Sequence, residues 1–197
     1  MRLIAFLLVL LAGAVGCALY TVVEPSRTRI GDSFSVEPQI RWTSIRQSGS
    51  SDLWTVDGPA LESLRLVKDV ADGQTLLGTA ISTPGPGGRT TPEDKQPRFR
   101  ASMTPSEIME LVVDTWTLVG ASKIQATGLR PAKFGSADGF RFELAFVWPD
   151  GVEARAIVAG AVVKSRLQLI VYSGTRLHYF DKYRPAIDRL FESVRVQ

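Results

Sequence analysis

The amino-acid sequence predicts an α+β fold, in which two helices pack on an antiparallel β-sheet. Residues 140–148 alternate aromatic or aliphatic side chains with other side chains, which is typical of a strand with one face in the core. Residues 104–107 read Thr-Pro-Ser-Glu, a sequence typical of a helix start. Near the end of the chain, apolar residues at 187, 190, 191 and 194 have the i, i+3, i+4, i+7 spacing of an amphipathic helix.

The first third of the chain favours short strands. Residues 33–36, 41–45 and 52–56 are rich in β-branched and aromatic residues, and Asp57-Gly58-Pro59 follows them as a turn signal. Residues 61–70 carry an apolar pattern that fits both a strand and a helix, and we predict a strand.

A long loop and a well-marked helix come next. Residues 83–97 contain four prolines and three glycines without apolar periodicity, so we expect a flexible surface loop. The helix should begin after Thr104 as N-cap, with Pro105 in the first position and Glu107 completing a capping box. Its apolar stripe continues to about Val119 and indicates packing against the sheet.

The C-terminal half predicts a β-meander. Pro149-Asp150-Gly151 forms a turn, and residues 152–163 return as a partner strand with a bulge or kink at Gly160. Lys164-Ser165-Arg166 makes the next turn, and a third strand follows over residues 167–173. The closing helix should start at about residues 183–185, because proline is tolerated only in the first turn of a helix.

This order of elements resembles the PsbP-like fold, known from the photosystem II accessory protein and from DcrB-like bacterial lipoproteins. The resemblance is carried by the helix at 104–119, the hairpin at 139–163, the strand at 167–173 and the helix after Pro185. The segments Pro105-Ser106-Glu107-Ile108-Met109-Glu110 and His178-Tyr179-Phe180-Asp181-Lys182-Tyr183 are also similar to those of uncharacterised proteobacterial envelope lipoproteins. The resemblance implies an accessory or binding role more often than catalysis, and it assigns no site residue.

The N-terminus has the pattern of a lipoprotein signal peptide. Arg2 precedes an apolar stretch, and Leu11-Ala12-Gly13-Ala14-Val15-Gly16-Cys17 places the only cysteine of the chain after small residues. We therefore expect cleavage between Gly16 and Cys17. The predicted organisation is a signal peptide over residues 1–16, a lipidated cysteine and tether over 17–27, and a single domain over 28–197.

Similarity to bacterial lipoproteins implies a diacylglyceryl thioether on Cys17 and a further acyl chain on its freed amine. Stable membrane attachment needs two or more acyl chains, and this arrangement supplies them. Ala18 follows the cysteine, where the family's sorting rule places Asp in proteins retained at the inner membrane. The expected location is thus the periplasmic face of the outer membrane, with the lipid bilayer as one partner.

Two other interpretations of this segment remain open. No charged residue lies between Arg2 and Glu24, so the apolar run is long enough for an uncleaved transmembrane span, which would make a single-pass anchored domain without acylation. A buried structural cysteine is the other alternative.

Composition excludes several classes of function. Cleavage would remove Arg2 alone from 23 basic residues against 20 acidic ones, so the net charge changes from +3 to +2. The basic residues are dispersed among acidic ones, so we expect no nucleic-acid binding. A single cysteine excludes intramolecular disulfides.

The sequence contains no recognisable catalytic or metal-binding set. His178 is the only histidine, so histidine metal sites and Ser-His-Asp triads lack their parts. Glu107, Glu110 and Asp114 share one helix face, which is best explained as a solvated surface. We expect no catalytic residue, no metal and no cofactor beyond the lipid on Cys17.

Three functional hypotheses follow. The first is a non-enzymatic accessory module that binds an envelope protein, with Trp42, Trp54, His178 and Tyr179 as possible partner contacts. The second is a carrier or sensor of a small apolar ligand, held between the helix at 104–119 and an aromatic face formed by Phe140, Phe142, Phe146 and Trp148. The third is a hydrolase that uses serine and carboxylates.

Overall fold

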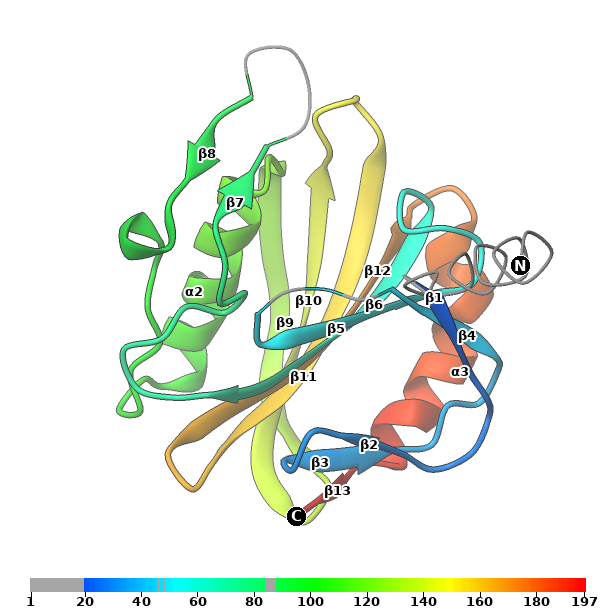
Figure 1. Cartoon of the computed structure of the whole chain (residues 1–197). Helices are drawn as coiled ribbons and strands as arrows, with labels where there is room; N and C mark the ends of the chain where they lie inside the picture. The colour runs from blue at the N-terminus through cyan, green and yellow to red at the C-terminus, as the bar shows by residue number, and fades with distance from the viewer. Residues whose placement is uncertain (1–19, 46, 48, 84–87) are drawn as a thin grey trace, which may run out of the picture.

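An eight-stranded antiparallel sheet forms the centre of the molecule (Figure 1). The computed structural model describes residues 20–45, 47, 49–83 and 88–197. The strands are β1 (Tyr20–Val23), β2 (Thr28–Ile30), β3 (Phe34–Val36), β4 (Trp42–Ile45), β5 (Ser51–Thr55), β6 (Glu62–Val70), β7 (Ile81–Ser82), β8 (Thr90–Thr91), β9 (Ser122–Phe134), β10 (Ala137–Val147), β11 (Glu153–Val163), β12 (Arg166–Thr175) and β13 (Arg195–Val196). The helices are the 3-10 turn η1 (Glu93–Lys95), α2 (Pro105–Leu118) and α3 (Tyr179–Glu192).

The strand order in the large sheet is β1-β4-β5-β6-β12-β11-β10-β9. Pairing of β6 with β12 joins the strands of the N-terminal third to the C-terminal meander, so both halves share one sheet. Two smaller sheets complete the fold: β13-β3-β2 and the pair β7-β8. The predicted α+β class is therefore confirmed.

Each face of the large sheet has its own hydrophobic core. One core joins α3 to side chains such as Leu64, Leu66 and Tyr172, and the other joins α2 to side chains such as Val67 and Phe142. Figure 1 accordingly shows α2 and α3 on opposite sides of the sheet. The central strands β11 and β12 are buried on both faces over most of their length, because helices cover both, whereas buried and half-buried residues are interspersed along β6.

Helix α2 begins as predicted. Thr104 accepts a hydrogen bond from the Glu107 backbone N–H, and the Glu107 carboxylate accepts one from the Thr104 N–H at 2.7 Å. The same carboxylate is exposed, and its hydrogen bonds to Thr104 lower its pKa. Ile108, Leu111 and Val112 turn into the core, which confirms the apolar stripe.

The predicted hairpin is confirmed, but the bulge at Gly160 is wrong. β11 pairs with β10 and β12 in unbroken register through Gly160. The glycine instead permits close packing, because a Cβ there would lie 2.4 Å from the Leu169 Cδ2 and 2.5 Å from the Gln168 carbonyl oxygen. The following turn uses positive φ at Lys164 and Ser165, which suits a two-residue hairpin.

Helix α3 starts earlier than the sequence predicted. It begins at Tyr179 and carries Pro185 in its interior. Phe180 and Tyr183 are buried in the first turns. Their burial holds the segment helical although an interior proline costs roughly 3 kcal/mol in a helix.

Three further differences concern segments of weak periodicity. β9 was not predicted, and it forms the edge of the sheet beside β10. The predicted tether over 17–27 contains β1, which pairs with β4, while Cys17 and residues 1–19 lie outside the described residues. The predicted loop over 83–97 contains β8 and η1 in its described part, and β8 pairs with β7.

Candidate functional site

Two of the predicted partner contacts belong to the core. Trp42 is 1% exposed and Trp54 is 3% exposed, and both pack in the cluster under α3. Alternation along β4 and β5 points both indoles to this face, so neither can form a docking surface in this fold. Their proposed contact role is therefore corrected.

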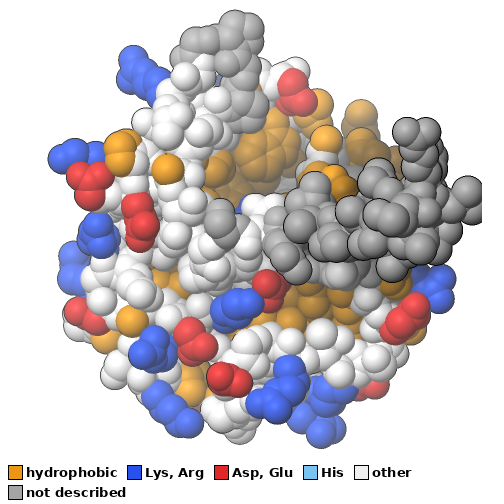
Figure 2. Space-filling view, in the orientation of Figure 1, with side chains coloured by type: hydrophobic (Ala, Val, Ile, Leu, Met, Phe, Trp, Pro, Cys, Tyr) orange, Lys and Arg blue, Asp and Glu red, His pale blue; other side chains and the backbone are white. Residues whose placement is uncertain are grey.

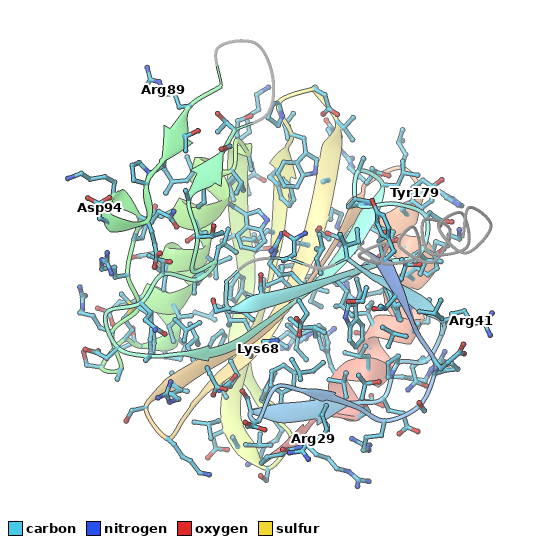
Figure 3. The ribbon with its side chains drawn as sticks, in the orientation of Figure 1. Arg29, Arg41, Lys68, Arg89, Asp94 and Tyr179 are labelled. Atoms are coloured by element: carbon cyan, nitrogen blue, oxygen red, sulfur yellow. The ribbon has the colours of Figure 1, made fainter. Side chains whose placement is uncertain are left out.

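His178 and Tyr179 lie where β12 turns into α3. His178 is exposed and Tyr179 is half-buried, and their rings are 5.0 Å apart in an edge-on arrangement. Figure 3 shows Tyr179 at the upper end of α3, far from Arg89 and Asp94 on the opposite side of the molecule. The Tyr179 carbonyl accepts a hydrogen bond from the Tyr172 hydroxyl at 2.6 Å, which fixes the helix start on the sheet.

Exposed apolar side chains gather at the same end of the sheet. Val56 and Leu61 lie in the β5–β6 turn, Val152 lies in the β10–β11 turn, and Leu177 lies before α3; we call these four residues the apolar end. Two backbone hydrogen bonds hold the three turns together: Thr175 N–H to the Leu61 carbonyl and Arg176 N–H to the Glu153 carbonyl, both 2.9 Å. Among the described residues, four of the six exposed large hydrophobic side chains belong to the apolar end.

Ion pairs surround the apolar end. Lys182 Nζ lies 2.6 Å from the Asp57 carboxylate, and the Tyr183 hydroxyl donates to the same carboxylate. The hydrogen bond from Lys182, followed by that from Tyr183, lowers the pKa of Asp57. Arg176 pairs with Glu153 at 2.6 Å. A polar rim of this kind around apolar residues is typical of protein interfaces.

The β5–β6 turn is ordered from beneath by Glu62. Its carboxylate is buried and accepts hydrogen bonds from the Thr55 hydroxyl at 2.6 Å and from the Val56 and Asp57 N–H groups. Burial is the largest influence on this group and raises the pKa of Glu62. The buried Glu62 carboxylate thus helps to fix the turn that presents Val56 and Leu61, together with the Thr55 hydroxyl, which accepts a hydrogen bond from the Gly58 N–H.

Three of the four aromatic residues predicted to form a ligand site are closed in the core. Phe140, Phe142 and Phe146 are buried in the cluster under α2, and Phe146 packs edge-on against Trp148 at 4.8 Å. The three phenylalanines are ordinary core and leave no space for a ligand, whereas Trp148 is half-buried and borders a cavity.

A cavity does exist at the C-terminal end of α2. It has a volume of about 110 Å³ and is lined by Ser63, Arg65, Leu77, Trp116, Val119, Trp148, Val171 and Ser173. Figure 2 shows the molecule hollowed in its upper half, with hydrophobic side chains inside the hollow. Arg65 was not singled out from the sequence, because a lone arginine in an alternating strand gives no signal of burial.

Neither a metal site nor a membrane-spanning helix is found among the described residues. There, no three His, Cys, Asp or Glu side chains are placed to hold a metal ion. Over the same residues, no helix combines the length and the apolar character needed to cross a membrane.

Comparison with known proteins identifies the fold. Neither a protein-family model nor a curated protein matches the chain. Among solved structures, cyanobacterial PsbP (CyanoP) from Synechocystis sp. PCC 6803 matches with a TM-score of 0.52 and 15% identity, over 94% of this chain and 96% of that one. LpqN of Mycobacterium tuberculosis, a protein involved in cell envelope biogenesis, matches with a TM-score of 0.42 and 11% identity, over 94% of this chain and 87% of that one. The likeness to CyanoP confirms the predicted PsbP-like α+β fold.

Proposed function

We propose that this protein is a non-enzymatic accessory module, anchored in the cell envelope through acylated Cys17 and bound to an envelope protein through the apolar end. The lipobox-like sequence supports export and anchoring, and Ala18 favours the periplasmic face of the outer membrane. The clustering of exposed apolar residues at one end of the sheet carries the proposal for the partner surface.

The chemistry of the apolar end suits a protein partner. Leu177 is 99% exposed and stands clear of the surface, where it can enter a pocket of another protein. A shallow groove of about 220 Å³ between the β5–β6 and β10–β11 turns is lined by Pro59, Ala60, Trp148, Pro149 and Asp150. Tyr179 and His178 border this surface and retain their predicted role as partner contacts.

Photocross-linking in native membranes tests the proposal. A photoreactive residue at Leu177 should capture one reproducible envelope protein, and the same residue at Ser165 should not, because Ser165 lies in the β11–β12 turn at the opposite end of the sheet. Replacement Leu177→Asp should abolish the association without unfolding the protein. Equal capture from both positions, or capture of lipid alone, would contradict a partner surface at the apolar end.

A further inference from the structure

Arg65 places a half-buried positive charge on the face of the sheet covered by α2. Its neighbours across the strands are Leu53 on β5 and Val171 on β12, and both are buried. Alternation along β6 sends Ser63, Arg65 and Val67 to this face and the leucines between them to the other. Along β6, the guanidinium therefore lies on this face between the half-buried Ser63 and the buried Val67.

No carboxylate of the chain neutralises this charge. All 20 acidic residues fall within the described residues, and none of them lies within 4.0 Å of the Arg65 guanidinium. The hydrogen bond that the guanidinium makes runs from Nη1 to the Ser51 hydroxyl, at 2.9 Å. Burial lowers the pKa of Arg65 to about 10, so the side chain is still protonated at neutral pH. Arg65 is half-buried, so the guanidinium N–H groups that make no hydrogen bond are open to an acceptor that enters the cavity.

The end of α2 does not provide the missing acceptor. Trp116 and Val119 line the cavity, but the carbonyls of Thr115, Trp116 and Thr117 already accept hydrogen bonds from backbone N–H groups. The serine hydroxyls of Ser63 and Ser173 lie 3.1 Å apart and bond to each other. They provide a second polar contact beside Arg65 but no negative charge.

The walls of the cavity are apolar and lead to the surface. Trp116, Leu77 and Val171 are buried around it, and the half-buried Trp148 separates it from the groove lined by Pro59 and Pro149. Since both spaces share Trp148, a ligand with its polar head at Arg65 can extend along the indole toward this groove.

We propose that this cavity binds an amphiphilic monoanion, with a carboxylate on the Arg65 guanidinium and an apolar body against Trp116 and Trp148. The planar guanidinium matches a carboxylate with two parallel hydrogen bonds. One positive charge neutralises one negative charge, so a dianion such as a phosphate would bring an excess charge into an apolar site. The volume of about 110 Å³ admits the head and the first carbons, and the rest of the body lies in the groove.

Isothermal titration of the full chain in nanodiscs with sodium octanoate tests this site, with empty nanodiscs as the reference for partitioning. Octanoate should bind at micromolar to millimolar concentration, whereas octanol and octylamine should not. Arg65→Met should weaken octanoate binding by about tenfold or more, because it removes a charge-assisted hydrogen-bond pair. Arg130→Met, at an exposed arginine of the edge strand β9, should leave binding unchanged.

A second variant tests the contribution of the ligand's apolar body to binding separately from that of its carboxylate. Trp148→Leu should weaken octanoate more than acetate, since acetate has no chain to place against the indole. Arg65→Met should remain folded, because it removes a half-buried charge that has no carboxylate partner, and a circular dichroism melt checks this. Unchanged octanoate affinity in folded Arg65→Met, binding of octanol equal to that of octanoate, or tighter binding of inorganic phosphate than of octanoate would each overturn the proposal.

Discussion

Glu62 shows how one buried carboxylate makes stability depend on pH. Burial raises its pKa above the value of the unfolded chain, so the folded state holds the proton more tightly. The stability associated with protonation is fully present below the unfolded pKa and is lost as the pH rises through the folded pKa. One oxygen of the carboxylate, Oε2, is buried and accepts no hydrogen bond, so the cost of burying the charged form is only partly offset.

Replacing Glu62 with glutamine should remove this pH dependence. Glu62→Gln keeps an acceptor for the Thr55, Val56 and Asp57 donors but carries no charge. As the pH rises from 4 to 7, the free energy of unfolding of this variant should increase relative to that of the wild type. Urea denaturation of both proteins measures this difference. The exposed Glu93→Gln serves as the control and should follow the wild type. Parallel curves for Glu62→Gln and the wild type would refute a raised pKa at this position.

Gly160 is required by packing rather than by backbone conformation. Gly160→Ala should lower the free energy of unfolding by about 1–3 kcal/mol, because its Cβ would overlap Leu169 and the Gln168 carbonyl. Ala145→Ser, at an exposed position of β10, should have little effect. A neutral Gly160→Ala in the same urea titration would show that β11 and β12 separate without cost.

At the scale of elements, α2 depends on its capping box. Thr104→Ala should destabilise the protein by about 1 kcal/mol, since it leaves the Glu107 N–H without its acceptor. Thr104→Ser retains the hydroxyl and should be close to the wild type, and Thr117→Ala on the exposed face of the same helix is the matched control. Thermal unfolding of the three variants measures the difference, and equal melting of Thr104→Ala and Thr104→Ser would argue against the cap.

Elements with strong local signals were predictable from the sequence, and those fixed by tertiary contacts were not. The capped helix and the Phe-rich hairpin have periodicities that their own residues establish. β9 contains Gly128 and Pro131 and is exposed along much of its length, so it has the composition of a loop and becomes a strand only beside β10. The early start of α3 likewise depends on burial of Phe180 against Tyr172, with ring centroids 5.7 Å apart.

The candidate surfaces were less predictable than the fold. Sequence reasoning proposed Trp42 and Trp54 as exposed anchors, but the face to which each indole points depends on strand register. His178 lies at the predicted connection between β12 and α3, whereas Tyr179 is the first residue of α3 because the helix begins earlier than the sequence predicts. Arg65 and the cavity beside it arise from pairing of β6 with β12 and the approach of α2, which no local pattern reports.

At the scale of the whole molecule, the two faces of the sheet differ in how completely their side chains fill the space under the helices. The face covered by α3 is closed by large side chains such as Trp42, Tyr172 and Phe180, whereas the face covered by α2 leaves the Arg65 cavity. The apolar end joins three turns from both halves of the chain, so its geometry depends on the complete fold. We therefore propose that this part of the molecule serves recognition and that the N-terminus serves attachment.

Attachment through Cys17 is the central claim, because it fixes where the recognition surface acts. The most direct measurement is mass spectrometry of the N-terminal peptide of the protein from native membranes, beside the Cys17→Ser form. We expect a mature chain that begins at Cys17 and carries a diacylglyceryl group and an N-acyl chain, and a Cys17→Ser form that is neither cleaved nor acylated. An intact chain that starts at Met1 with an unmodified Cys17 thiol would contradict the lipoprotein account and indicate an uncleaved membrane span.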